Sequence, residues 1–122
     1  MRNEMIKGYI DAIVLSILNR EDAYGYEISK FVHAETAGQF ELKEGTLYPA
    51  LKRIEANGYI EGYWDDRDLG PRRRYYRITK DGQKKLKEYR NSWTNNIQII
   101  NTFLGGELNG TNHTILKPNF TS

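Results

Sequence analysis

Apolar positions in the first third of the chain recur with the period of an amphipathic α-helix. Apolar residues recur there at spacings of three, one and four, which predicts a helix over about residues 4–19 with one buried face. After the polar break NRED, Asp22 is a candidate cap for a second helix over about 23–36, which Gly38 closes. The predicted buried side of this second helix carries Tyr24, Ile28, Phe31 and Val32.

A third helix is predicted over about residues 45–57. Its core stripe has apolar residues at positions i, i+4 and i+7, namely Leu47, Leu51 and Ile54. Asn57 and Gly58 supply a left-handed stop. Proline is tolerated in the first turn of a helix, because its missing N–H would have no partner there. Pro49 therefore indicates a start close to Thr46.

Two short alternating segments follow, YIEGYW at 59–64 and RYYRI at 74–78, separated by the polar turn DDRDLGP. This pattern predicts a β-hairpin with a long tip. Alternate strand positions face opposite sides, so at least half of the hairpin aromatics are expected in the core. These aromatics are Tyr59, Tyr63, Trp64, Tyr75 and Tyr76.

The last periodic segment predicts one long helix over about 81–104, with Thr79 as its cap. Its apolar positions follow each other at spacings of three, four, four, three and four: Leu86, Tyr89, Trp93, Ile97, Ile100 and Leu104. Such spacing is typical of a seam between helices. A body of about 80 residues is too small to cover this seam, so a second copy of the chain is expected there, with these six residues at the dimer interface.

Three helices followed by a hairpin are the layout of a winged helix, in which the third helix enters the DNA major groove and the hairpin is the wing. The predicted fold is therefore mainly α with a small β-hairpin. A winged helix-turn-helix is expected over 1–80 and a dimerisation helix over 81–106. Residues 107–122 lack periodicity and are expected to form a flexible tail.

Charge is distributed unevenly along the chain, although the net charge is only +2. Residues 72–90 hold nine lysines or arginines against two acidic residues, a local charge of +7, whereas residues 1–71 carry −5. This asymmetry indicates a local anion-binding surface on an otherwise neutral or acidic protein.

Two features point to DNA as the anion. The start of the third helix offers free N–H groups, the positive end of the helix dipole, and hydroxyl groups. The wing crowds three guanidinium groups whose repulsion an anion relieves. The predicted DNA-binding residues are Lys43, Thr46, Tyr48, Pro49, Lys52, Arg53, Arg72, Arg73 and Arg74. An exposed recess at the helix and a solubilising turn, with Asp65, Asp66 and Asp68 paired to the arginines, are the alternatives.

Composition excludes several other classes. With no cysteine, and with His33 and His113 far apart, no metal site, cofactor or thiol chemistry is expected. No serine has recognisable His and Asp partners, so no catalytic residues and no enzyme are expected. The longest apolar run has four residues, too short to cross a bilayer, and the start MRNEMIKGYI does not resemble a signal peptide. A cytoplasmic protein is expected.

A second function remains open from these residues alone. The hairpin aromatics could be a platform for single-stranded RNA, or the winged helix could serve protein contacts only. A steep salt dependence and a preference for duplex DNA would distinguish a regulator from such an adaptor.

Three motifs in order carry a family resemblance: YGYEI at 24–28, EGTLYPALKRIEANGYI at 44–60 and GPRRRYYRITKDG at 70–82. The chain resembles the PadR-like transcriptional regulators over roughly residues 9–104. The resemblance implies a dimeric repressor that controls a nearby gene for detoxification, efflux or phenolic-acid handling. It also implies release by a small molecule or a stress signal. Two paired chains would present two recognition helices about one DNA turn apart, so the operator is expected to be an inverted repeat.

Within that family the chain resembles the short branch, which dimerises through a single C-terminal helix. Multidrug-binding members of this branch place a tryptophan after a serine on the dimer helix, and Ser92 and Trp93 match that pair. The resemblance implies that a planar aromatic molecule stacks between the two copies of Trp93, with Tyr9 and Ile97 as further candidate ligand contacts. The alternative is that Trp93 is simply a residue of the seam.

Overall fold

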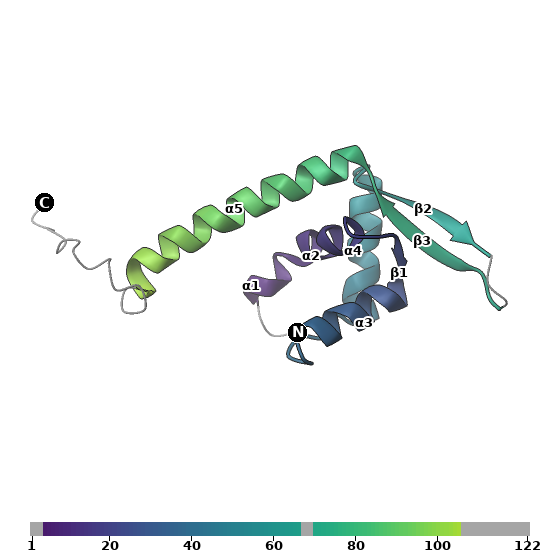
Figure 1. Ribbon diagram of the computed structural model, residues 1–122, viewed down its shortest axis with the longest axis horizontal. Helices are drawn as coiled ribbons and strands as arrows, with labels where there is room; N and C mark the ends of the chain where they lie inside the picture. The colour runs from purple at the N-terminus through teal and green to yellow at the C-terminus, as the bar shows by residue number, and fades with distance from the viewer. Residues whose placement is uncertain (1–3, 67–69, 106–122) are drawn as a thin grey trace, which may run out of the picture. The chain divides into compact units, whose positions relative to one another are not determined.

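The computed structural model describes residues 4–66 and 70–105. This part of the chain is mainly helical with a small antiparallel sheet, which confirms the predicted fold class (Figure 1). The elements in chain order are α1 (Glu4–Lys7), α2 (Ile10–Leu18), β1 (Ala23–Tyr24), α3 (Gly25–Glu35), α4 (Glu44–Ala56), β2 (Ile60–Asp65), β3 (Arg73–Ile78) and α5 (Lys80–Leu104). The chain forms two packing units, and the boundary between them lies between Lys87 and Glu88. The tail predicted at 107–122 lies outside the described residues.

The first predicted helix is interrupted rather than continuous. α1 ends at Lys7, Gly8 and Tyr9 form a turn, and α2 begins at Ile10. The amide of Gly8 donates to the carbonyls of Glu4 and Met5 at 3.3 and 3.2 Å. Glycine disfavours a helix interior by about 1 kcal/mol relative to alanine. Apolar spacing alone does not reveal such a break, because the periodicity continues on both sides of it.

The second helix begins later than predicted, and Asp22 is not its cap. Ala23 and Tyr24 are extended and pair with β3, opposite Tyr76 and Tyr75. α3 then starts at Gly25. A strand of two residues is too short for an alternating pattern, so the sequence carries no signal for it. The end of α3 agrees better with the prediction, since Gly38 is left-handed with a φ of 78°.

α4 begins at Glu44, where the carbonyl of Lys43 accepts hydrogen bonds from Thr46 and Leu47. Pro49 is therefore the sixth residue of the helix, and the inference that it marks the first turn is wrong. The last turn confirms the predicted stop in part: Gly58 is left-handed with a φ of 79°, whereas Asn57 is right-handed. The amides of Gly58 and Tyr59 donate back to the carbonyls of Glu55 and Ile54, both at 2.9 Å, which satisfies the helix end.

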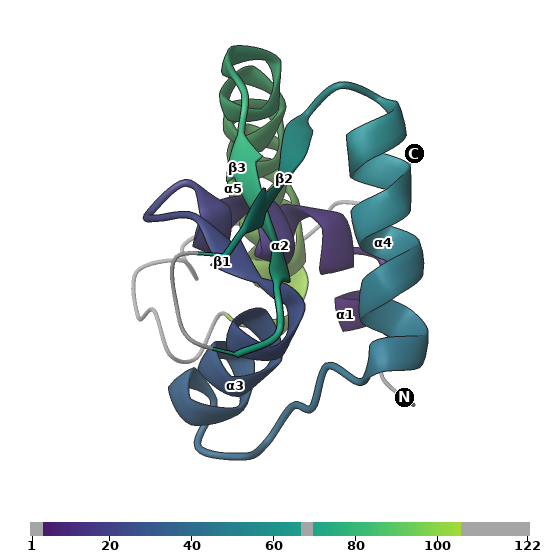
Figure 2. The ribbon, with the colours of Figure 1, turned by 90° about the vertical axis from the view of Figure 1, so that its right-hand side faces the viewer.

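The inner face of α4 is the centre of the core. As predicted, Leu47, Leu51 and Ile54 are buried. α4 contacts both α2 and α3, and α2 also contacts β3. The helices around α4 contribute further buried residues, among them Val14, Leu15, Leu18, Ile28 and Val32. Figure 2 shows α4 beside the sheet, with α3 near its N-terminal end.

The sheet has the strand order β1-β3-β2, and all its pairs are antiparallel. β2 and β3 project from the helical body as the wing (Figure 1). Of the five hairpin aromatics only Tyr76 is buried, and Trp64 is 53% exposed. The expectation that at least half would lie in the core is therefore wrong. The residues far along a projecting hairpin have no helix to cover them.

α5 is anchored where its capping residue was predicted. Thr79 Oγ1 accepts a hydrogen bond from the Gly82 amide at 3.0 Å. A side chain at Gly82 would collide with the carbonyl oxygen of Tyr59, so only glycine fits. Leu86 is 3% exposed and belongs to the same unit. It therefore packs within the chain and does not contribute to the exposed stripe of α5, although the sequence placed it at the dimer interface.

Candidate nucleic-acid interface

The outer face of α4 is polar along its N-terminal half. Lys43, Tyr48, Pro49 and Lys52 are exposed, and Thr46 is half-buried. Because the leucines of α4 point inward, these side chains point away from the core. Five of the nine DNA-binding residues predicted from the sequence thus gather on one surface at the start of the helix.

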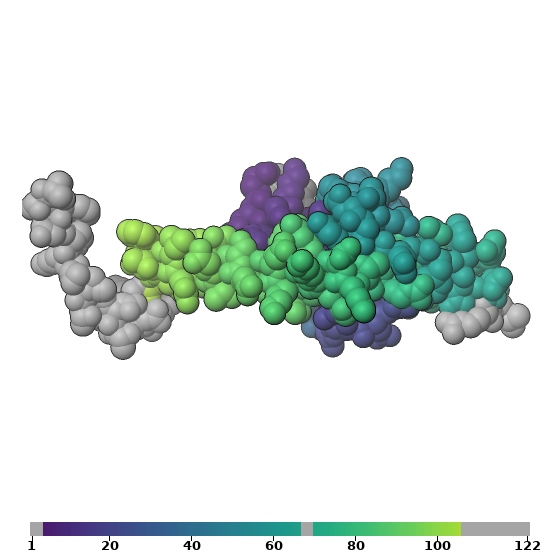
Figure 3. Space-filling view, turned by 90° about the horizontal axis from the view of Figure 1, so that it is seen from above, coloured from purple at the N-terminus to yellow at the C-terminus, as the bar shows by residue number. Residues whose placement is uncertain are grey.

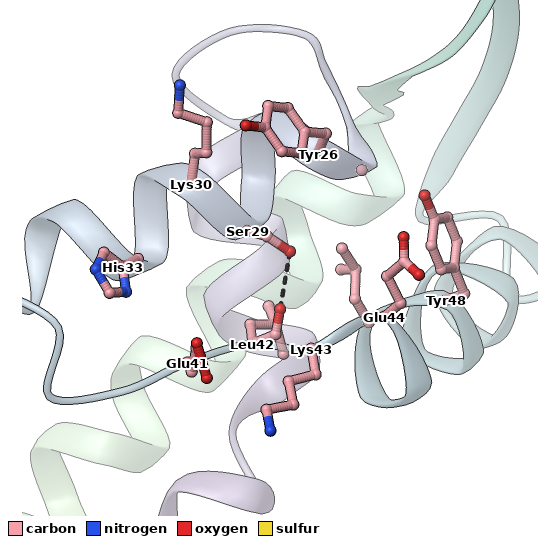
Figure 4. A pocket seen from close by; sticks show the side chains of 11 residues that line it. Tyr26, Ser29, Lys30, His33, Glu41, Leu42, Lys43, Glu44 and Tyr48 are labelled. Atoms are coloured by element: carbon pink, nitrogen blue, oxygen red, sulfur yellow. Dashed lines mark hydrogen bonds between the residues drawn. The ribbon is translucent and has the colours of Figure 1, made fainter.

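Tyr48 occupies a specific position on this surface. A Cβ atom built on Gly25 would lie 2.7 Å from the Tyr48 hydroxyl oxygen, so the tyrosine rests against the first residue of α3. Glycine at this point allows the close approach. Tyr48 remains 44% exposed, and its hydroxyl group is directed toward the start of α3 (Figure 4). The motif YGYEI contained this glycine, but the sequence did not reveal its partner.

A hollow of about 330 Å³ separates α3 from the start of α4. Ser29 is one of the residues that line it, and its hydroxyl donates to the Leu42 carbonyl at 2.8 Å (Figure 4). The rim is lined by Tyr26, Lys30 and His33 on one side and by Glu41, Lys43 and Glu44 on the other. Acidic and basic groups are therefore mixed around the hollow.

Arg53 lies on a different part of α4 and is tied to α2. Its Nε and Nη2 atoms donate to the two carboxylate oxygens of Asp11, at 3.0 and 2.6 Å. Such a bidentate ion pair fixes the orientation of the guanidinium plane as well as the position of its charge. Of the residues predicted to bind DNA, Arg53 therefore has a structural partner that the sequence did not indicate.

The three wing arginines lie against aromatic rings. The guanidinium of Arg72 is 5.1 Å from the centre of the Trp64 ring, and that of Arg73 is 4.8 Å from the centre of the Tyr24 ring. Arg74 lies over both Trp64 and Tyr76. Cation–π contacts of this kind stabilise a cation by about 0.5–1 kcal/mol at exposed sites. Of the aspartates proposed as alternative partners, Asp65 lies opposite Arg73 in the strand register, and Asp68 is outside the described residues.

Tyrosines form a row on one face of the sheet. Tyr63 stacks on Tyr75 with ring centres 5.9 Å apart, Tyr75 meets Tyr24 edge-on at 5.2 Å, and Tyr24 stacks on Tyr26 at 6.4 Å. The row crosses from the wing to α3. Aromatic contacts therefore connect the wing with the helical body.

A hydrogen bond between Tyr63 and Asp22 joins the wing to the segment between α2 and β1. The Tyr63 hydroxyl donates to Asp22 Oδ2 at 2.6 Å. This hydrogen bond, followed by burial and the charge of Asp22, raises the pKa of Tyr63 to about 12. The sequence signal at Asp22 was misleading, because an aspartate before a helix is more often a cap.

The second half of α5 carries an exposed apolar surface. Trp93, Ile100 and Leu104 are exposed, and Ile97 is half-buried, all at the predicted spacing. Ile99 and Phe103 are also exposed, and the predicted stripe did not include them. Ile99 and Phe103 are four residues apart and therefore lie in one row along the helix. This second row widens the exposed apolar surface.

The described residues contain no cluster of three or more metal-ligating side chains. No helix in the described ranges is both long and apolar enough to span a membrane.

The helices α2 and α3 packed on α4, together with an arginine-bearing hairpin, define a winged helix-turn-helix protein. The model of the transcriptional regulator PadR-like family matches residues 14–88, and the chain belongs to this family. It is therefore a DNA-binding transcriptional regulator and not an enzyme.

Relatives of similar length support this assignment. An uncharacterised protein of Lysinibacillus sphaericus is 39% identical over 106 residues, which cover 87% of this chain and 97% of that protein. The structure of a transcriptional regulator from Clostridium thermocellum has 42% identity and a TM-score of 0.79, covering 85% and 98% of the two chains. A PadR family transcription regulator from Clostridium difficile has 40% identity and a TM-score of 0.69, with coverages of 79% and 98%.

We expect Tyr63→Phe to lower the free energy of unfolding by about 1 kcal/mol at neutral pH, because it removes one hydrogen bond to a carboxylate. The pKa of Tyr63 is raised in the folded state, so its contribution is complete below pH 10 and disappears as the pH rises toward 12. Denaturant unfolding of both proteins across this range measures the difference. Tyr26→Phe, at an exposed tyrosine, is the control, and a difference that stays constant up to pH 12 would contradict the assignment.

Proposed function

We propose that the protein is a homodimeric repressor that binds an inverted-repeat operator. The observation that carries the dimer is the exposed apolar surface of α5, which includes Trp93, Ile100, Phe103 and Leu104. Exposed apolar rows of this kind mark contacts with another protein. A second copy of the same helix matches the 3.5-residue spacing, and a twofold axis places the same residues on both sides.

The proposed operator contact uses α4 and the wing together. Thr46, Tyr48, Pro49 and Lys52 face the major groove, and Lys43 faces a flanking phosphate. Figure 3 shows the surfaces of α4 and of the hairpin adjoining each other. Arg72 and Arg73 reach the minor groove or its phosphates. Because Arg53 and Arg74 are held by Asp11 and Glu55, we assign them to holding the elements rather than to direct contact.

Sedimentation and footprinting test the proposal together. We expect a dimer in solution and two protected half-sites related by twofold symmetry, about 34 Å apart, because each copy presents one α4. Duplex DNA should bind with a steep salt dependence, and single strands weakly. A monomer, or equal and weak binding to both kinds of DNA, contradicts the proposal and favours an adaptor for protein or RNA.

Arg73→Ala should weaken binding to every duplex and reduce the slope of log K against log salt by about 0.9, the value for one lost phosphate contact. Titrations at several salt concentrations measure the slope. Arg77→Ala is the matched control, because Arg77 is further from the tip and pairs with Glu61. An Arg73→Ala protein with the slope of the wild type would show that this side chain does not meet a phosphate.

We also propose that the regulated gene encodes an efflux or detoxification function and that a planar aromatic molecule releases the repressor. The ligand would stack between Trp93 and the partner's Trp93, with Ile97 as a further contact. The exposure of a tryptophan, 42% in the single chain, supports this proposal, because a flat π surface suits an aromatic ligand. Release requires that the ligand binds more tightly to a dimer whose two α4 helices no longer match the operator.

Tryptophan fluorescence tests the ligand proposal. We expect planar aromatic compounds to quench the wild-type emission and to lower operator affinity. The chain has two tryptophans, so Trp93→Phe should lose most of the quenching, whereas Trp64→Phe should retain it. Equal quenching in both variants, or quenching without any loss of operator binding, assigns Trp93 to packing alone.

A further inference from the structure

Arg74 differs from its neighbours Arg72 and Arg73 in where its side chain lies. A Cβ atom built on Gly62 of β2 would be 2.6 Å from Arg74 Nη2, 2.7 Å from Cζ and 2.8 Å from Nε. The guanidinium therefore lies flat against the backbone of Gly62. Any side chain at position 62 would displace it, so the glycine provides the space that the arginine occupies.

The guanidinium of Arg74 ends between three partners. It lies 5.5 Å from the centre of the Trp64 ring and 6.0 Å from the centre of the Tyr76 ring. Its Nη2 atom donates to Glu55 Oε2 at 3.2 Å. Both charged side chains are only about one-third exposed, at 36% and 35%. This ion pair is less screened by water than a surface pair.

The partners belong to different elements. Trp64 and Gly62 are in β2, Arg74 and Tyr76 are in β3, and Glu55 is in the last turn of α4. The contact therefore joins both strands of the wing to α4, whose opposite end carries Thr46 and the other proposed groove residues. A rigid planar fork suits this site, because it stacks on rings and reaches a carboxylate at the same time.

We infer that Arg74 is a positioning residue that sets the wing on α4, that Gly62 makes room for it, and that it does not contact DNA. The inference rests on the proposed use of α4 and the wing on one operator. When the Arg74–Glu55 pair is broken, the wing loses its fixed angle to α4, and both can no longer meet the duplex together without an ordering cost.

The sign of the effect of Glu55→Gln tests this inference. The substitution removes one negative charge from a protein that binds a polyanion, so electrostatics alone predicts tighter binding. The positioning role predicts the opposite, with operator binding about tenfold weaker, because a charged hydrogen bond that orders the wing is lost. Glu61→Gln is the matched control: it removes the same charge from β2, where Glu61 pairs with Arg77 at 3.3 Å and is exposed. We expect it to bind as tightly as the wild type or more tightly.

Gly62→Ala tests the same inference without any change of charge. We expect weaker operator binding with the salt slope of the wild type, because no phosphate contact is removed. Arg74→Lys, which keeps the charge but not the planar fork, should behave in the same way. Circular dichroism melts establish whether each variant is folded. If Glu55→Gln or Gly62→Ala does not fold, Arg74→Lys is measured in its place.

The outcomes separate the inference from the proposed function. If the wild type binds duplex DNA but Glu55→Gln tightens binding as Glu61→Gln does, the positioning role is wrong and the proposed function stands. A reduced salt slope in Arg74→Lys or Gly62→Ala would assign Arg74 to a phosphate instead. If the wild type does not bind duplex DNA, the proposed function fails, and the inference fails with it.

Discussion

The burial of one face of α4 is the constraint on which the rest of the structure depends. The large buried residues of α4, Leu47, Leu51 and Ile54, are almost wholly removed from water. Burying each such side chain stabilises the folded state by about 1.5–3 kcal/mol. A helix has one inward and one outward face, so this burial fixes which side chains point out. The outward positions carry hydroxyl and cationic groups, including Thr46 and Lys52. The proposed operator contact is thus a consequence of the core.

Beyond its buried residues Ile60 and Tyr76, the wing is held by directed contacts. Trp64 is exposed, and the hairpin extends past the helices that could cover it. Its guanidinium groups lie on aromatic rings, which relieves part of their mutual repulsion. The hydrogen bond from Tyr63 to Asp22 and the ion pair of Arg74 with Glu55 connect the wing to the helical body. Such contacts depend on direction, so they fix an angle in a way that apolar packing at the tip would not.

α5 combines two kinds of surface in one helix. Its first turns belong to the winged-helix unit, where Gly82 passes close to Tyr59 and Leu86 is buried. Beyond Glu88 the apolar side chains are mostly exposed in the single chain. Exposed apolar surface is unfavourable in water at about 25 cal/mol per Å². A second copy would remove this cost, and the DNA-binding units would then be paired by the same helix.

The sequence by itself determined the features that leave a repeating or capping pattern within one short segment of the chain. The inward stripe of α4, its left-handed stop at Gly58, the hairpin and the cap at Thr79 are all of this kind, and the structure confirms them. The tertiary structure alone decided the strand β1, the partner of Asp22, and the ion pairs Arg53–Asp11 and Arg74–Glu55. The two residues are 41 positions apart in the Tyr63–Asp22 pair, 42 in Arg53–Asp11 and 19 in Arg74–Glu55. Periodicity and capping signals do not extend over such distances, because only the folded core brings the partners together.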